Sequence, residues 1–159
     1  MNVATRMSAD ELRELYRELI LDHAKQPRHF GKLNKATHSA QGINPLCGDK
    51  LSLYLQIDAA GRISDAAFEG TGCAISVASA SLLTDAVIGL DTADVLQMFR
   101  GVTARLTGNQ DDHGDGVVPE KLRSLEGVRE FPARVKCATL AWHALHNAIE
   151  QQDHQASTE

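Results

Sequence analysis

One short stretch of strict alternation limits what this chain can fold into. Leucine and isoleucine occupy every second position from Leu51 to Ile57, which is the pattern of a strand with one buried face. Asp58 to Gly61 then supplies a turn, and Arg62 to Glu69 continues as a second strand of a hairpin. Lys35 to Gly42 is a candidate third strand. The sequence therefore predicts a small antiparallel sheet of about three strands.

Helical patterns flank this sheet on both sides. Ser8 and Glu11 have the spacing of a capping box and begin a helix that Pro27 stops. The expected buried face of this helix carries Leu12, Leu15, Tyr16, Leu19 and His23. Further helices are expected over Cys73 to Ile88, from Asp91 or Thr92 to Gly101, for one or two turns over Pro119 to Glu126, and from Pro132 onward. This order predicts an α+β fold in which helices pack on one face of the sheet.

Length and charge exclude several classes of protein. A chain of 159 residues that is 43% hydrophobic is expected to form a single domain over 1–159, with 1–7 and 151–159 frayed. A net charge of -5 without a Lys/Arg cluster argues against nucleic-acid binding. There is no run of apolar residues long enough for a membrane span, and no signal peptide at the first residues. We therefore expect a cytoplasmic protein.

Three cysteines, too few for a disulfide scaffold, lie at predicted structural breaks. Cys47 sits in a Pro/Gly loop two residues before Asp49, and Cys73 begins a helix, where the dipole stabilises a thiolate. Cys137 is expected in the first turn of the last helix, close to Arg134. Three thiolates and a carboxylate complete a tetrahedral zinc site. The alternative, three separate cysteines packed as small apolar side chains, stays open.

Other constellations are weaker. Gly70-Thr71-Gly72 lacks the third glycine and the βαβ order of a dinucleotide site. His143 and His146 are three residues apart on a helix, but a solvated or core-edge role fits such a pair better than a shared ligand. The segment Asp111 to Asp115 matches no EF-hand spacing and is interpreted as a solvated loop.

Three cysteine-containing motifs cover Asn44 to Asp49, Gly70 to Ser76 and Arg134 to Trp142. Together they resemble the iron-sulfur cluster assembly proteins of the IscU and NifU N-terminal superfamily. Scaffolds of the IscU branch carry a His just before the third cysteine, where this chain has Lys136. An insertion of about 20 residues within 102–131 is also similar to the SufU branch, so both departures favour that branch.

The resemblance implies a zinc ion held by Cys47, Asp49, Cys73 and Cys137. It also implies a role in accepting persulfide sulfur from a pyridoxal-phosphate-dependent cysteine desulfurase of the SufS type and passing it to the downstream iron-sulfur assembly machinery. Cys47 is the leading sulfur acceptor because it lies on a flexible loop, Cys137 is the second candidate, and Arg134 orients the site or contacts the desulfurase. An iron-sulfur cluster scaffold, with the cluster on the same ligands, is the main alternative. A purely structural zinc module is a third.

Overall fold

The computed structural model describes residues 8–46, 48–107, 118–150 and 156–157. The elements follow one another as α1 (Ala9–Lys25), β1 (His38–Asn44), β2 (Asp49–Ile57), β3 (Ile63–Thr71), α2 (Ala74–Val87), α3 (Thr92–Thr107), the 3₁₀ helix η2 (Glu120–Glu130), α4 (Pro132–Glu150) and β4 (Ala156–Ser157). The predicted α+β class is confirmed. None of the helices in these ranges is both long and apolar enough to cross a membrane.

The sheet has the predicted antiparallel core. Its strand order is β3-β2-β1-β4, and the first two hairpins pair β1 with β2 and β2 with β3. The strand predicted over Lys35 to Gly42 is β1, which begins at His38. The short strand β4 pairs in parallel with β1, and it lies in the C-terminal segment that was predicted to fray. The alternation in β2 is that of a one-sided strand, because Leu51, Leu53 and Leu55 are buried while the residues between them are partly exposed.

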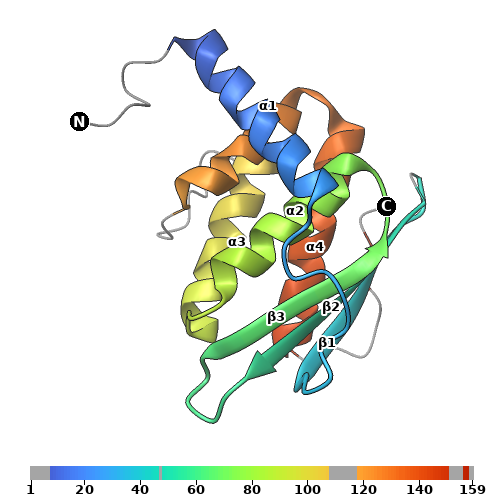
Figure 1. Ribbon diagram of the computed structural model, residues 1–159, viewed down its shortest axis with the longest axis vertical. Coiled ribbons are helices and arrows are strands. Elements are labelled where there is room, and N and C mark those ends of the chain that lie inside the picture. The colour runs from blue at the N-terminus through green and yellow to red at the C-terminus, as the bar shows by residue number, and fades with distance from the viewer. Residues whose placement is uncertain (1–7, 47, 108–117, 151–155, 158–159) are drawn as a thin grey trace.

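Two helices, α2 and α4, cover one face of the sheet (Figure 1). The small residues of α2 let these two helices approach closely, since Ala78 and Ser79 are fully buried between them. The Ser79 hydroxyl donates to the carbonyl of Ala138 at 2.6 Å and accepts from the indole Nε1 of Trp142 at 3.1 Å. Trp142 is thereby held in the core with its one polar atom paired.

Helix α1 begins as the capping box predicts, with the Ser8 hydroxyl accepting a hydrogen bond from the backbone N–H of Glu11 at 3.1 Å. It lies across α2 and η2. The predicted buried face is correct at His23 and wrong at Leu15, whose side chain is 47% exposed. Ile20 is buried instead. The buried residues of α1 are therefore Ile20 and His23, which lie three positions apart on one face near its C-terminal end.

Two of the expected helix limits are wrong. Helix α3 continues through Gly101 to Thr107, because Gly101 is buried in a helix that packs on α4 and η2, and tertiary contact outweighs the low helix propensity of glycine. The expected short turn from Pro119 is an 11-residue 3₁₀ helix, with Leu122 and Leu125 in the core. The range 102–131, predicted as an insertion, therefore contains core-forming residues; 108–117 lie outside the described residues.

The C-terminal end of α1 is fixed to α2 by a buried histidine. Nδ1 of His23 lies 2.7 Å from the Ser81 hydroxyl oxygen, which also accepts the backbone N–H of Arg28 at 2.8 Å. Burial is the main cause that lowers the pKa of His23 from 6.5, with Arg28 as a further contribution. The ring is thus neutral at pH 7, and Nδ1 shares one hydrogen bond with the Ser81 hydroxyl.

This histidine makes the stability of the fold depend on pH. Because its pKa is lower in the folded state, the folded protein binds fewer protons than the unfolded chain, and stability falls as the pH drops below about 6.5. We expect the urea midpoint to decrease between pH 7.5 and 5.5, and His23→Gln to decrease that pH dependence. His38→Gln, at the start of β1, is the control and should keep the wild-type dependence. Identical slopes in wild type and His23→Gln would contradict the prediction.

Candidate metal centre

The hairpin between β1 and β2 places the first part of the site. Asn44 and Asp49 are direct partners in the register, so their side chains lie on the same face of the sheet, and both are fully buried on the helix-covered side. The loop between them contains Gly48, whose φ of +73° favours glycine. Cys47 belongs to this loop and lies outside the described residues, so its predicted role stays a prediction.

A second segment, after β3, brings Cys73 to Asp49. Cys73 is the N-cap of α2, as predicted, and its sulfur accepts the backbone N–H of Ser76 at 3.5 Å. Its own N–H donates to Oδ1 of Asp49 at 2.9 Å. Two glycines make this approach possible: a Cβ at Gly70 would lie 2.1 Å from the Lys50 carbonyl oxygen, and a Cβ at Gly72 would lie 2.7 Å from Oδ1 of Asp49.

Helix α4 supplies Cys137, but not as expected. Cys137 is the sixth residue of α4 and therefore lies in its second turn, where the helix N-terminus stabilises a thiolate less than in the first. It is buried, and Asn44 Nδ2 donates to its sulfur at 3.6 Å. The close contact of α4 with β1, where a Cβ at Gly42 would lie 3.0 Å from Leu140, sets this position.

The three described ligands converge. One carboxylate oxygen of Asp49 and the sulfurs of Cys73 and Cys137 all lie within 4.8 Å of one another. In a tetrahedral zinc site with bonds of about 2.3 Å, sulfur atoms are roughly 3.8 Å apart. Small side-chain rotations thus place these three atoms around one ion.

The charge of the site also fits a metal. Asp49 is fully buried, and of the ion pairs formed in the described ranges none includes it. A buried carboxylate without a cationic neighbour is unfavourable. Two thiols and one carboxylate are a donor set suited to zinc. The two thiolates are also the ligands that bind iron-sulfur clusters. The residues therefore fit either group.

Asn44 is the residue of this site that sequence reasoning missed. Its Oδ1 is buried without a hydrogen-bond partner, which costs on the order of 1 to 3 kcal/mol. The signal that identifies it is its place directly opposite Asp49 across the hairpin. Asn44 therefore belongs to the site through its amide, although it is not one of the predicted ligands.

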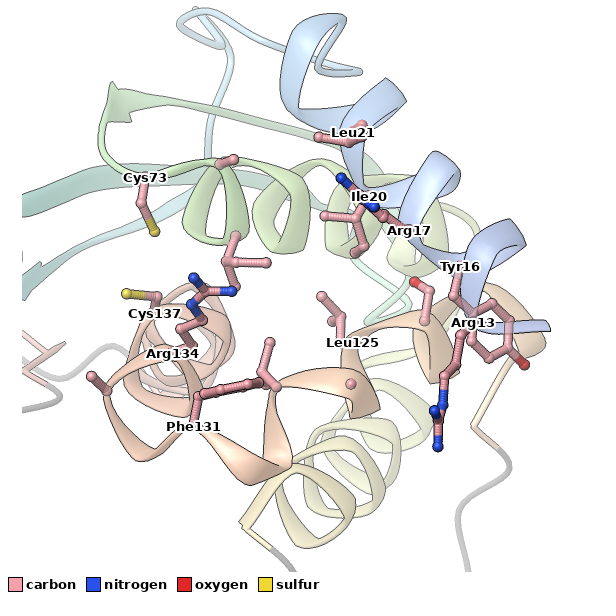
Figure 2. Close-up of a pocket in the computed structure, with 16 residues that line it drawn as sticks. Arg13, Tyr16, Arg17, Ile20, Leu21, Cys73, Leu125, Phe131, Arg134 and Cys137 are labelled. Carbon is pink, nitrogen blue, oxygen red and sulfur yellow. The ribbon is translucent and has the colours of Figure 1, made fainter. Parts of the chain in front are cut away.

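A groove of about 760 Å³ opens from the two cysteines along α1, η2 and α4. Figure 2 shows Cys73 and Cys137 together on one side of this groove, with the Arg134 side chain beside them. The Arg134 guanidinium lies 5.2 Å from the centroid of the Phe131 ring, in a cation-π contact. Arg13 and Arg17 of α1 line the far part of the groove. Arg134 therefore lies beside the cysteines (Figure 2), and its role stays a prediction.

The histidine pair of α4 lies elsewhere. The rings of His143 and His146 contact Phe99 of α3, with centroid distances of 5.7 and 5.0 Å. Burial lowers the pKa of His143, and His146 lowers it further. This is the core-edge role predicted for the pair. The segment Asp111 to Asp115 lies outside the described residues.

Comparison with known proteins places the chain in a family. The family described as "NifU-like N terminal domain" matches residues 15–158. The zinc-dependent sulfurtransferase SufU of Bacillus subtilis is 40% identical over 139 residues, 87% of this chain and 92% of that protein. The iron-sulfur cluster assembly scaffold protein IscU of Streptococcus pyogenes is 39% identical over 145 residues, 91% of this chain and 89% of that protein.

A solved structure has the same fold. A protein from Fervidobacterium islandicum that is described as a "Putative iron-sulfur cluster assembly scaffold protein for SUF system" superposes with a TM-score of 0.74 at 31% identity, covering 86% of this chain and 98% of that one. The fold is that of a cluster-assembly domain. This chain belongs to the NifU-like N-terminal domain family.

Gly72 provides a test of the site geometry. A methyl group at Gly72 would press on the Asp49 carboxylate, so we expect Gly72→Ala to weaken zinc binding at least tenfold, as changes next to metal ligands do. Competition with a chromophoric chelator measures this affinity. Gly127→Ala is the matched control, because a Cβ there meets no atom within 4 Å. Equal zinc affinity in the two variants would show that Asp49 is not a ligand.

Proposed function

We propose that this chain accepts persulfide sulfur from a pyridoxal-phosphate-dependent cysteine desulfurase of the SufS type during iron-sulfur cluster assembly. Cys47, Asp49, Cys73 and Cys137 hold a zinc ion, and Cys47 is the acceptor. The observation that carries the proposal is the convergence of Asp49, Cys73 and Cys137 at the end of the hairpin that bears Cys47. Free thiols in such a site require a reducing compartment, which supports the cytoplasm.

Two further observations support the sulfur-acceptor role. A relative with 40% identity is named a zinc-dependent sulfurtransferase. Lys136 stands where scaffolds of the IscU branch have a His, and a charged lysine is not a metal ligand. Zinc, when bound, would keep the thiols ionised and stabilise the fold around them.

The transfer itself is a thiol-disulfide type of exchange. The Cys47 thiolate attacks the outer sulfur of the desulfurase persulfide, a new S–S bond forms on Cys47, and the S–S bond to the desulfurase cysteine breaks. The desulfurase cysteine leaves as a thiolate, so one persulfide is exchanged for another with no net oxidation. Asp49 would be a hard oxygen ligand among sulfur ligands, and its role in this proposal is to tune how readily a thiolate is released.

The groove beside the cysteines suits the approach of a protein that carries a persulfide. Its floor is apolar, and Leu21 and Phe131 at its walls are exposed. Arg17 and Arg134 belong to no ion pair formed by the described residues, although the chain as a whole is acidic. This local positive charge suits a partner whose surface around its persulfide cysteine is acidic. Arg134, next to Cys137, is positioned to orient the arriving persulfide anion.

The cluster scaffold remains the second candidate, because one relative at 39% identity is named a scaffold and a structural neighbour is described as one. It uses the same ligands and differs in the resident metal. A purely structural zinc module requires a closed site. The exposure of Cys73 at the groove argues against that role.

Sulfur transfer with cysteine variants tests the acceptor role. We expect purified wild type to be colourless with one zinc, and Cys47→Ala to lose persulfide uptake from the desulfurase as measured by mass spectrometry. Cys137→Ala is the control: it also removes a ligand, but it should keep persulfide on Cys47. Uptake by Cys47→Ala at the wild-type rate would show that another cysteine is the acceptor. Iron with a thiolate-to-iron absorption band would favour the scaffold.

Charge reversal in the groove tests the docking face. In reactions of the desulfurase with this protein as the varied substrate, Arg17→Glu should raise KM about tenfold and leave kcat unchanged. Arg17 lies away from the cysteines, and in this proposal it only steers and binds the partner. Arg62→Glu, at the turn before β3, makes the same change in net charge outside the groove. Steady-state stimulation of the desulfurase is the measurement. An equal effect of both variants would mean that only net charge matters.

A further inference from the structure

Asn44 occupies an unusual position for a buried amide. It ends β1, is fully buried, and faces the helix layer directly opposite Asp49. Its Nδ2 lies 3.6 Å from the sulfur of Cys137, whereas its Oδ1 has no hydrogen-bond partner. The fold thus keeps a polar group with one half unsatisfied beside one of the metal ligands. An apolar side chain of the same size would avoid that cost.

The direction of this hydrogen bond depends on the state of the sulfur. A thiol can donate its proton to an amide oxygen, but a metal-bound thiolate has no proton and only accepts. The amide N–H of Asn44 faces the sulfur, which is the arrangement that a bound thiolate needs. The orientation of the side chain is therefore matched to the ionised form of Cys137.

The two described cysteines differ in their surroundings. Cys73 is exposed at the groove and takes its hydrogen bond from the first turn of its own helix. Cys137 is 3% exposed and receives the amide of a residue 93 positions away in the chain. A hydrogen bond withdraws electron density from a thiolate, which makes the sulfur a poorer nucleophile. The same bond fixes the position of the sulfur, and loss of such an orienting partner typically lowers metal affinity about 10- to 100-fold.

We propose, resting on the metal centre of the proposed function, that Asn44 is a positioning residue whose N–H···S hydrogen bond keeps Cys137 as the retained metal ligand. Because of this bond, the cysteine ligands have different roles. The cysteine on the loop after Asn44 is left to exchange sulfur, and Cys137 stays in place. Asn44 does so without contacting the persulfide.

Cobalt substitution tests this role directly. We expect Asn44→Leu loaded with Co(II) to show its sulfur-to-cobalt charge-transfer band at lower energy than wild type, because the sulfur regains electron density. Its affinity for zinc, measured by chelator competition, should fall about tenfold. Should Asn44→Leu not fold, Asn44→Ala removes the same donor without changing the shape beyond a small cavity, and the same shift is expected.

A matched control comes from the same helix as Cys137. Asn147 is also a buried asparagine, ten residues or about 15 Å further along α4. Asn147→Leu makes the identical chemical change and should leave the band and the zinc affinity at wild-type values.

The outcomes separate this inference from the function on which it rests. A wild-type chain that binds neither cobalt nor zinc would overturn both. Normal metal binding by wild type, with the band of Asn44→Leu unchanged, would overturn the inference alone. A loss of thermal stability in Asn44→Leu without a band shift would do the same, since it would show a packing role only.

Discussion

The buried carboxylate of Asp49 is the interaction on which the arrangement of this site depends. It is removed from water at the start of β2, and it accepts the backbone N–H of Cys73 across a chain crossing that only glycine permits. The start of β2 and the start of α2 are therefore joined through one oxygen atom. A charge in such a place is stable only when a cation or donors surround it. The site is in this sense organised around a negative charge.

The packing of small residues decides how close the ligands come. Alanine and serine along α2 allow α4 to lie against it, with the Ser79 hydroxyl paired to both Ala138 and Trp142. On its other side α4 meets β1 at Gly42. Cys137 is placed by these contacts and not by the start of its helix. Because α1 and η2 stand away from the cysteines, a groove remains open to one side of the site.

Much of the fold was predictable from local pattern. The alternation of β2, the capping box at Ser8 and the N-cap at Cys73 are each set by residues close in sequence, and each is confirmed. The predictions that were wrong, the end of α3 and the buried face of α1, depend on burial by segments far away in the sequence. Gly101 reads as a helix stop, but inside α3 it is buried by other helices. Leu15 reads as part of an apolar stripe, although the neighbours of α1 cover an adjacent stripe instead.

The amino-acid sequence alone establishes which chemical groups this protein has available: three thiols, a carboxylate two residues after the first, and glycines where the chain must turn sharply. These follow from residue identity and short spacings. Only the tertiary structure decided that Asp49, Cys73 and Cys137 meet within 4.8 Å, that Cys137 is the buried member, and that Asn44 contacts it. The physical reason is that these contacts join residues 24 to 93 positions apart. Such contacts are fixed by sheet register and helix packing, which no local pattern contains.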